Sequence, residues 1–145
     1  PRYGSSAASD VYKRQLIKPA PDWTSWDSTA EATHQISREV LETHGKSVYE
    51  VAHELNEILE GMTLYSDGWS VDKPWLTKLF HAAGIEMKFN VSPLEIILSE
   101  VQMEMWHQTK DRVIAEHKLT RHRASTDAWI IQETYKHTLQ KTNID

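Results

Sequence analysis

The chain has 145 residues, contains no cysteine and carries a formal net charge of −5 at pH 7. This length suits one domain with a single core, and the lack of cysteine excludes disulfides, zinc–thiolate sites and thiol catalysis. No apolar run is long enough to span a membrane, and the acidic balance disfavours broad nucleic-acid binding. We therefore expect a soluble, cytoplasmic protein that binds proteins or itself rather than membranes.

The first fifteen residues differ from the rest of the chain. Residues 1–15 end in Asp-Val-Tyr-Lys-Arg-Gln and resemble translated adapter sequence of the kind attached to open reading frames from environmental sequencing. We expect this segment to be non-native, and we interpret the fold without it. The segment has three basic side chains and one acidic side chain, so the remaining residues carry a net charge of −7.

Residues 16–27 form a lead-in that contains two prolines and two of the six tryptophans. Its proline spacing predicts turns and extended backbone rather than a helix. Trp23 and Trp26 lie three residues apart and need a surface to cover. They either close over the domain's own core or dock to a partner, and we retain both as candidate partner-binding residues.

Capping boxes mark the starts of the first two expected helices. Ser28 and Glu31 open a helix that ends at Gly45, and Ser47 and Glu50 open a second helix with an apolar stripe. That stripe contains Val48, Val51, Ala52, Leu55, Ile58, Leu59 and Met62. Because the linker between these helices is short, we expect them to pack as an antiparallel pair.

Two stretches in the middle of the chain predict a minor β element. Residues 63–71 contain Asp67-Gly68, a turn signal for a small hairpin or a loop, and a short helix over 72–83 then ends at Gly84. Residues 85–91 alternate apolar and polar side chains, as a half-buried strand does. Since one strand is not stable alone, this stretch pairs with residues 63–71, pairs across a dimer, or covers the core as an extended linker.

The longest expected helix covers residues 92–119. Ser92 and Glu95 form its capping box, and neither glycine nor proline occurs after Pro93 within it. The four–three spacing predicts one buried stripe: Leu94, Leu98, Val101, Met105, Gln108, Arg112, Ala115 and Leu119. A helix of about 40 Å would be the spine of an all-α bundle of four to five helices, within a single domain over residues 28–145.

A last helix is expected after the spine. Ser125, Thr126 and Asp127 provide its N-terminal cap. Its expected buried face contains Ala128, Ile131, Tyr135, Thr138 and Leu139.

A metal-binding row lies on the flank of the expected spine helix. Glu104, His107 and Asp111 follow a Glu-x-x-His-x-x-x-Asp pattern. Carboxylates with a neutral imidazole suit one divalent transition metal, with a histidine from a neighbouring helix completing the site. The alternative is an ordinary surface row that pairs with basic neighbours such as Lys110.

Basic side chains gather near the end of the same helix. The cluster contains Lys110, Arg112, His117, Lys118, Arg121, His122 and Arg123. These cations complement the helix dipole, bind a partner through Arg121 and Arg123, or contact a nucleic-acid backbone. Gln108 and Arg112 are expected to form a polar layer inside the bundle, with Arg112 paired to a facing carboxylate.

The sequence contains neither a Gly-x-Ser-x-Gly nucleophile elbow nor a glycine-rich phosphate loop. Our leading hypothesis is a non-enzymatic helical interaction or assembly protein without a cofactor, self-associating through the spine helix or the lone strand. Two alternatives stay open. One is a metal-binding protein or metal-dependent enzyme that uses Glu104, His107 and Asp111, and the other is a small nucleic-acid-associated protein that uses the Arg121 cluster.

Overall fold

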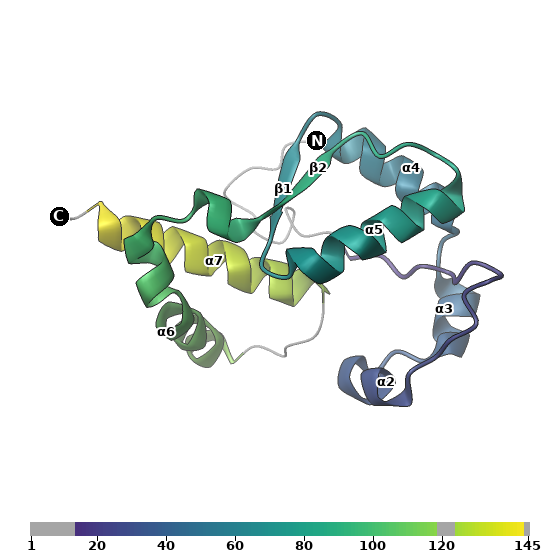
Figure 1. Cartoon of the computed structure of the whole chain (residues 1–145). Helices are drawn as coiled ribbons and strands as arrows, with labels where there is room; N and C mark the ends of the chain where they lie inside the picture. Colours follow the sequence, from purple (N-terminus) through teal and green to yellow (C-terminus); the bar gives the residue numbers. More distant parts are fainter. Residues whose placement is uncertain (1–13, 119–123, 144–145) are drawn as a thin grey trace. The chain divides into compact units, whose positions relative to one another are not determined.

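The computed structural model describes residues 14–118 and 124–143, which contain six α-helices and a two-stranded parallel sheet (Figure 1). Contacts divide the chain into an N-terminal unit, residues 15–96, and a C-terminal unit that follows residue 96. The expectation of a mostly helical chain is confirmed. The finer prediction of an all-α bundle with four to five helices is wrong, because the described residues contain six α-helices and two paired strands. The strands lie in or overlap residues 63–71 and 85–91, the two stretches that predicted a minor β element. The segment expected to be non-native, residues 1–15, lies almost wholly outside the described residues.

The first expected helix is two helices, α2 (Ser28–His34) and α3 (Arg38–His44). Gln35 follows α2 in the left-handed conformation, with φ of 58°, and this interrupts the helix. The hydroxyl of Ser37 then accepts a hydrogen bond from the Val40 N–H and caps α3. A polar cap inside the apolar pattern thus divides what the spacing alone predicts as one helix.

Side-chain caps fix the starts of α2 and α4 (Val48–Leu59). The cap of α2 is Asp27, whose carboxylate accepts from two backbone N–H groups of the first turn, so the predicted capping box at Ser28 is wrong. The predicted cap of α4 is confirmed, because the Ser47 hydroxyl accepts from the Glu50 N–H. The cap residues in both places are among the strongest N-cap formers.

The two strands belong to a β-α-β unit. β1 (Thr63–Ser66) and β2 (Asn90–Pro93) pair in parallel, and α5 (Trp69–Ala83) connects them (Figure 1). A parallel pair needs such a crossover. Of the two interpretations of residues 63–71, a hairpin or a loop, the hairpin is therefore wrong. The predicted end of α5 at Gly84 is confirmed, since this residue has a φ of 70°, which glycine adopts without a steric penalty.

The segment before β2 behaves as the alternation predicts. Ile85, Met87 and Phe89 face the core, whereas Glu86 and Lys88 are exposed. Only the end of this stretch is a strand, and the rest is an extended segment covering the core. Its pairing with the segment that contains β1 matches one of the three interpretations of the sequence.

One hydrophobic core joins α4, α5 and the two strands. Its buried residues are Ala52, Phe80, Phe89 and Val91, and the rings of Phe80 and Phe89 meet edge to face at a centroid distance of 5.7 Å. Partly buried aliphatic side chains surround them. The core therefore forms around the β-α-β unit and α4, not around a spine helix.

The C-terminal unit is an antiparallel pair of helices, α6 (Glu100–His117) and α7 (Ala124–Thr142). The start of α6 meets the end of α7 where the Gln102 amide donates to the Thr138 hydroxyl at 3.2 Å. At the other end, the ring of His117 lies 4.8 Å from that of Trp129. In the ranges that the structure describes, no helix is both long and apolar enough to cross a membrane.

The predicted spine over residues 92–119 is wrong at its N-terminal end. Ser92 lies in β2, a 3₁₀ turn follows, and α6 begins eight residues later. The true capping box joins Ser99 and Gln102. The Ser99 hydroxyl accepts a hydrogen bond from the Gln102 N–H, and the Gln102 side-chain oxygen accepts one from the Ser99 N–H. Strand pairing at Ser92 therefore overrode a local helix-start signal.

The buried row of α6 is shifted by one position along the chain from the predicted stripe. Its members are Gln102, Trp106, Thr109 and Val113. Gln108 and Arg112 are exposed, so the predicted polar layer at these two positions is wrong. On α7, the buried residues are Ile130, Thr134 and Thr138, of which the sequence predicted only the last.

Candidate docking site

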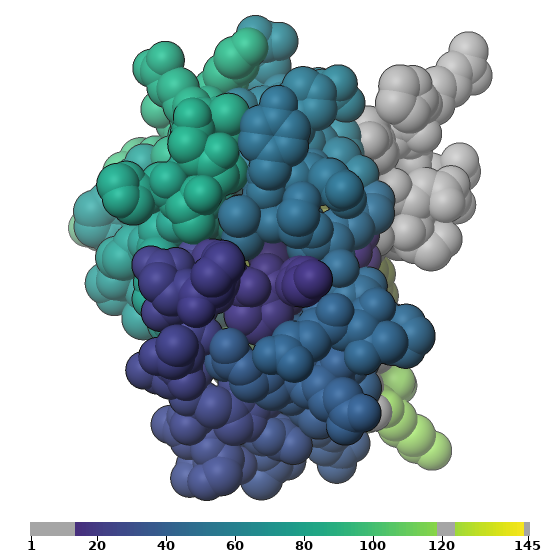
Figure 2. Space-filling model, turned by 90° about the vertical axis from the view of Figure 1, so that its right-hand side faces the viewer, coloured from purple at the N-terminus to yellow at the C-terminus, as the bar shows by residue number. Residues whose placement is uncertain are grey.

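The lead-in is fixed to the N-terminal unit by backbone hydrogen bonds. The Lys18 N–H donates to the Lys46 carbonyl at 2.8 Å, and the Lys46 N–H donates to the Leu16 carbonyl at 3.0 Å. Ile17 and Lys46 thus form an isolated parallel bridge. Figure 2 shows the purple lead-in at the surface, next to the blue helices that follow it. The docked lead-in forms one wall of a pocket.

The Lys46 side chain strengthens the same attachment point. Its Nζ lies 2.6 Å from Glu54 Oε1 on α4. The hydrogen bond to Glu54, together with the negative charges of Glu54 and Glu50, raises the pKa of Lys46 above its usual value. The residue that anchors the lead-in through its backbone therefore also joins α4 through its ammonium group.

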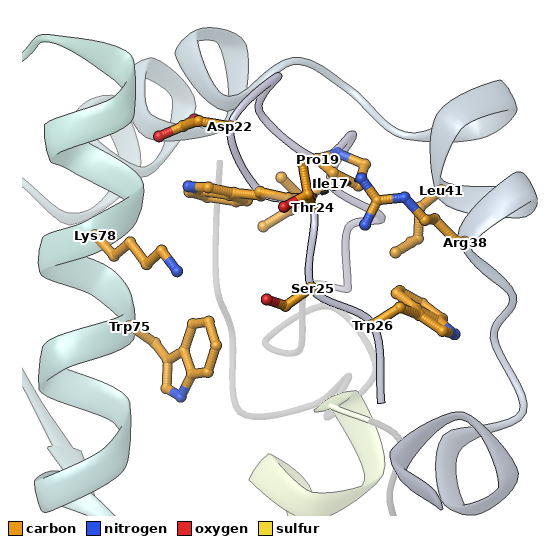
Figure 3. Close-up of a pocket in the computed structure, with 11 residues that line it drawn as sticks. Ile17, Pro19, Asp22, Thr24, Ser25, Trp26, Arg38, Leu41, Trp75 and Lys78 are labelled. Carbon is orange, nitrogen blue, oxygen red and sulfur yellow. Dashed lines mark hydrogen bonds between the residues drawn. The ribbon is translucent and has the colours of Figure 1, made fainter. Parts of the chain in front are cut away.

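A pocket of about 370 Å³ lies between the lead-in, α3 and α5 (Figure 3). We call it the tryptophan pocket, and its lining consists of Ile17, Pro19, Asp22, Trp23, Thr24, Ser25, Trp26, Arg38, Leu41, Trp75 and Lys78. Its volume is in the range of small ligand sites, and its lining combines aromatic and aliphatic side chains with a few polar groups.

Three indole rings line this pocket. Trp23 is half-buried, whereas Trp26 is 38% exposed and Trp75 is 60% exposed. The Trp26 indole N–H donates to the Glu31 carboxylate, which fixes this ring at the end of the lead-in. Exposed indoles held in fixed positions are typical of surfaces that bind a partner.

Lys78 lies between two of the rings. Its Nζ is 5.4 Å from the centroid of Trp23 and 5.2 Å from that of Trp75, so both rings attract the ammonium group. Within residues 14–118 and 124–143, Lys78 makes neither an ion pair nor a hydrogen bond. Its N–H donors are therefore open to an acceptor that enters the pocket.

Arg38, the second cation of the pocket, is already engaged. Its Nε lies 3.1 Å from Glu42 Oε1, and its Nη2 donates to the Trp23 carbonyl at 2.6 Å. The guanidinium carbon also lies 6.0 Å from the centroid of the Trp26 ring. Arg38 thus positions the lead-in, whereas Lys78 is the cation available to a ligand.

The structure brings the two tryptophans predicted to bind a partner into one site. Trp23 and Trp26 both line the pocket, and whether they bind a partner stays a prediction. The sequence did not identify Trp75 as a member of the site. The signal that could have found it is the spacing of Trp75 and Lys78, which places an indole and an ammonium on one helix face.

The other predicted partner-binding residues, Arg121 and Arg123, lie outside the described residues. The basic cluster near them, and the nucleic-acid hypothesis that depends on it, stay predictions. His117 of the same cluster packs on Trp129, and its Nδ1 lies 3.0 Å from the Val113 carbonyl. One member of the cluster therefore has a structural role.

Glu104, His107 and Asp111 form an exposed row on α6. In the part of the chain that the structure describes, no group of three or more histidine, aspartate or glutamate side chains comes together in an arrangement that could hold a metal ion. No further ligand thus joins this row there, and the single-metal hypothesis gains no support from the described geometry.

Comparison with known proteins adds no further constraint. No protein-family model, curated protein or solved structure matches the chain. The tryptophan pocket must therefore be interpreted from its own geometry and chemistry.

Proposed function

We propose that this chain is a non-enzymatic helical interaction protein and that the tryptophan pocket is the surface on which a protein partner docks. The observation that carries this proposal is the arrangement of three indoles around one open pocket, two of them more than a third exposed. A fully covered tryptophan buries about 150–250 Å², so covering the exposed parts of these rings contributes to the free energy of partner binding.

The construction of the pocket supports docking. Hydrogen bonds hold the lead-in in place, and α3 and α5 supply the opposite walls (Figure 3). A surface that is already ordered loses little conformational entropy when a partner binds. The lead-in, with Trp23 and Trp26, is therefore held in place before a partner binds.

Self-association is the other part of the proposal. Pairing across a dimer was one of three interpretations of residues 85–91, but the strand at the end of this stretch pairs with β1 in the same chain. The edge of β2 that faces β1 is therefore not available to a second copy. Exposed apolar residues on the α6–α7 pair, Val101, Met103 and Leu139, provide another surface for a second copy. Sedimentation velocity over a wide concentration range measures this directly: a rising sedimentation coefficient supports self-association, and a constant monomer value contradicts it.

A peptide-display experiment tests the docking surface. The immobilised protein is screened against displayed random dodecapeptides, and enriched peptides are synthesised and titrated in solution. We expect Trp75→Ala to weaken their binding by at least about 2 kcal/mol, or about thirtyfold in Kd, as for an interface anchor. Tyr49→Ala is the matched control, since Tyr49 is 55% exposed but lies outside the pocket. If no peptide binds the wild type better than Trp75→Ala, the proposal is wrong.

A further inference from the structure

Resting on the proposed function, we infer that the partner presents an acidic linear segment, in which an aspartate or glutamate carboxylate binds Lys78 and a neighbouring apolar side chain packs on the indoles. Two features support this chemistry. The pocket has an ammonium group without an anionic partner among the described residues, and it has exposed aromatic surface beside that group.

The geometry of Lys78 favours a carboxylate. The rings of Trp23 and Trp75 attract the ammonium group but supply no hydrogen-bond acceptor, and the Lys78 side chain is exposed at the surface. In Figure 3, the Lys78 ammonium and the Ser25 hydroxyl both point into the space between α5 and the lead-in. A carboxylate that enters this space accepts a charge-assisted hydrogen bond from Lys78, which is about twice as strong as a hydrogen bond between neutral groups.

The charge of the surrounding unit explains why the ligand is a peptide rather than a nucleic acid. Residues 15–96 contain thirteen acidic and six basic side chains, a formal net charge of −7. A polyanion would meet this charge along its whole length, whereas a short segment with one carboxylate can place it on Lys78, the pocket cation that has no ion pair among the described residues. The pocket is thus a local positive site in an acidic unit.

The remaining lining residues fit the rest of such a segment. The Trp23 and Trp75 rings provide apolar surface near the cation, and Pro19 and Leu41 provide it on the other side of the pocket (Figure 3). Asp22 is the one acidic side chain of the lining and opposes the bound carboxylate. This opposition is itself testable, because Asp22→Asn should strengthen binding of acidic peptides.

The test compares the peptides that different variants select. Wild type, Lys78→Glu, Lys78→Met and Lys73→Glu are screened against the same random-dodecapeptide library, and the selected peptides are titrated by calorimetry. Lys73→Glu is the matched control, because it makes the same charge change on α5 outside the pocket. Circular dichroism and thermal melting of each variant show that it is folded before it is screened.

We expect wild type and Lys73→Glu to select peptides with an acidic residue beside an apolar one. Lys78→Met should bind these peptides at least about tenfold more weakly, and Lys78→Glu should select basic residues instead. Peptides that need Trp75 but are neither acidic nor sensitive to Lys78→Glu would overturn this inference and leave the proposed function standing. If no peptide depends on Trp75, both are wrong.

Discussion

The backbone of Lys18 passes so close to Gly45 that no side chain fits between them: a Cβ atom at Gly45 would lie 2.4 Å from the Lys18 nitrogen. The same atom would lie 2.4 Å from the carbonyl oxygen of Leu41. Gly45 has an ordinary φ of −73°, so glycine is needed here for space and not for its conformational freedom. This contact decides whether the lead-in can dock and complete the tryptophan pocket.

Gly45→Ala should therefore displace the lead-in. Both neighbouring atoms are backbone, which cannot move aside as a flexible side chain would, and the expected cost is about 1–3 kcal/mol, as for overpacking in a core. Chemical denaturation measures the loss of stability, and limited proteolysis within residues 16–27 measures the release of the lead-in. Gly68→Ala is the control, since its Cβ would meet nothing nearer than 3.7 Å. Equal resistance of Gly45→Ala and wild type to proteolysis would show that the close contact does not constrain docking.

Among the polar residues of the N-terminal unit, Asn56 should contribute most to stability. Its side chain is buried, donates to the Glu86 carbonyl at 2.7 Å and accepts from the Lys88 N–H at 2.8 Å. Asn56→Ala would leave both backbone groups without these partners, at a cost of about 2–3 kcal/mol in the free energy of unfolding. Urea denaturation provides the measurement. The neighbouring Glu57→Ala is the control and should change stability by less than about 0.5 kcal/mol, because Glu57 is exposed.

The position of the helix start can be tested with two serines. Ser99→Ala removes the side-chain cap of α6 and should cost about 1 kcal/mol, whereas Ser92→Ala should have little effect because Ser92 lies in β2. Thermal or urea denaturation compares the two variants. The reverse order of stabilities would mean that the helix begins at Ser92, as the local sequence pattern predicts.

The ion pair of Lys46 and Glu54 predicts a dependence on alkaline pH. Because the pKa of Lys46 is raised in the folded state, its contribution to stability is complete below the unfolded value of about 10.4 and is lost as the pH rises through the folded value. Lys46→Met should accordingly have a lower Tm than wild type at pH 7, and this difference should shrink above about pH 10.4. Both side chains are partly exposed, so the difference at pH 7 should be small and should decrease at high salt. If the Tm difference between wild type and Lys46→Met does not change with pH, the ion pair of Lys46 makes no contribution to stability.

Local capping chemistry in the sequence determined several helix ends. The Ser47 hydroxyl caps α4, and Gly84 ends α5. Both effects depend only on residues within one helical turn, since the hydroxyl accepts from a first-turn N–H and the glycine adopts a positive φ. Such helix ends can therefore be predicted from the local sequence. The alternation over residues 85–91 likewise predicted which side chains are buried.

Only the tertiary structure decided which of two competing local signals prevailed. Ser92 and Ser99 each begin a capping-box pattern. Ser92 pairs with Tyr65 and therefore lies in strand β2, so only Ser99 begins a helix. Similarly, Trp75 belongs to the tryptophan pocket only because the lead-in docks beside it through Gly45 and Lys46, contacts between segments far apart in the sequence.

The buried face of α6 shows the same limit. The predicted row and the buried row share one four–three spacing and are shifted by one position. Over the same part of α6 the predicted row contains Val101, Met105, Gln108 and Arg112, and the buried row contains Gln102, Trp106, Thr109 and Val113. Each row has two apolar and two polar side chains, so hydrophobicity alone does not choose between the predicted row and the buried row. The latter is buried because Gln102 finds the hydroxyl of Thr138 on α7, and a polar side chain can be buried only where such a partner exists. The sequence by itself set the period of the helix, and the partner helix selected the face.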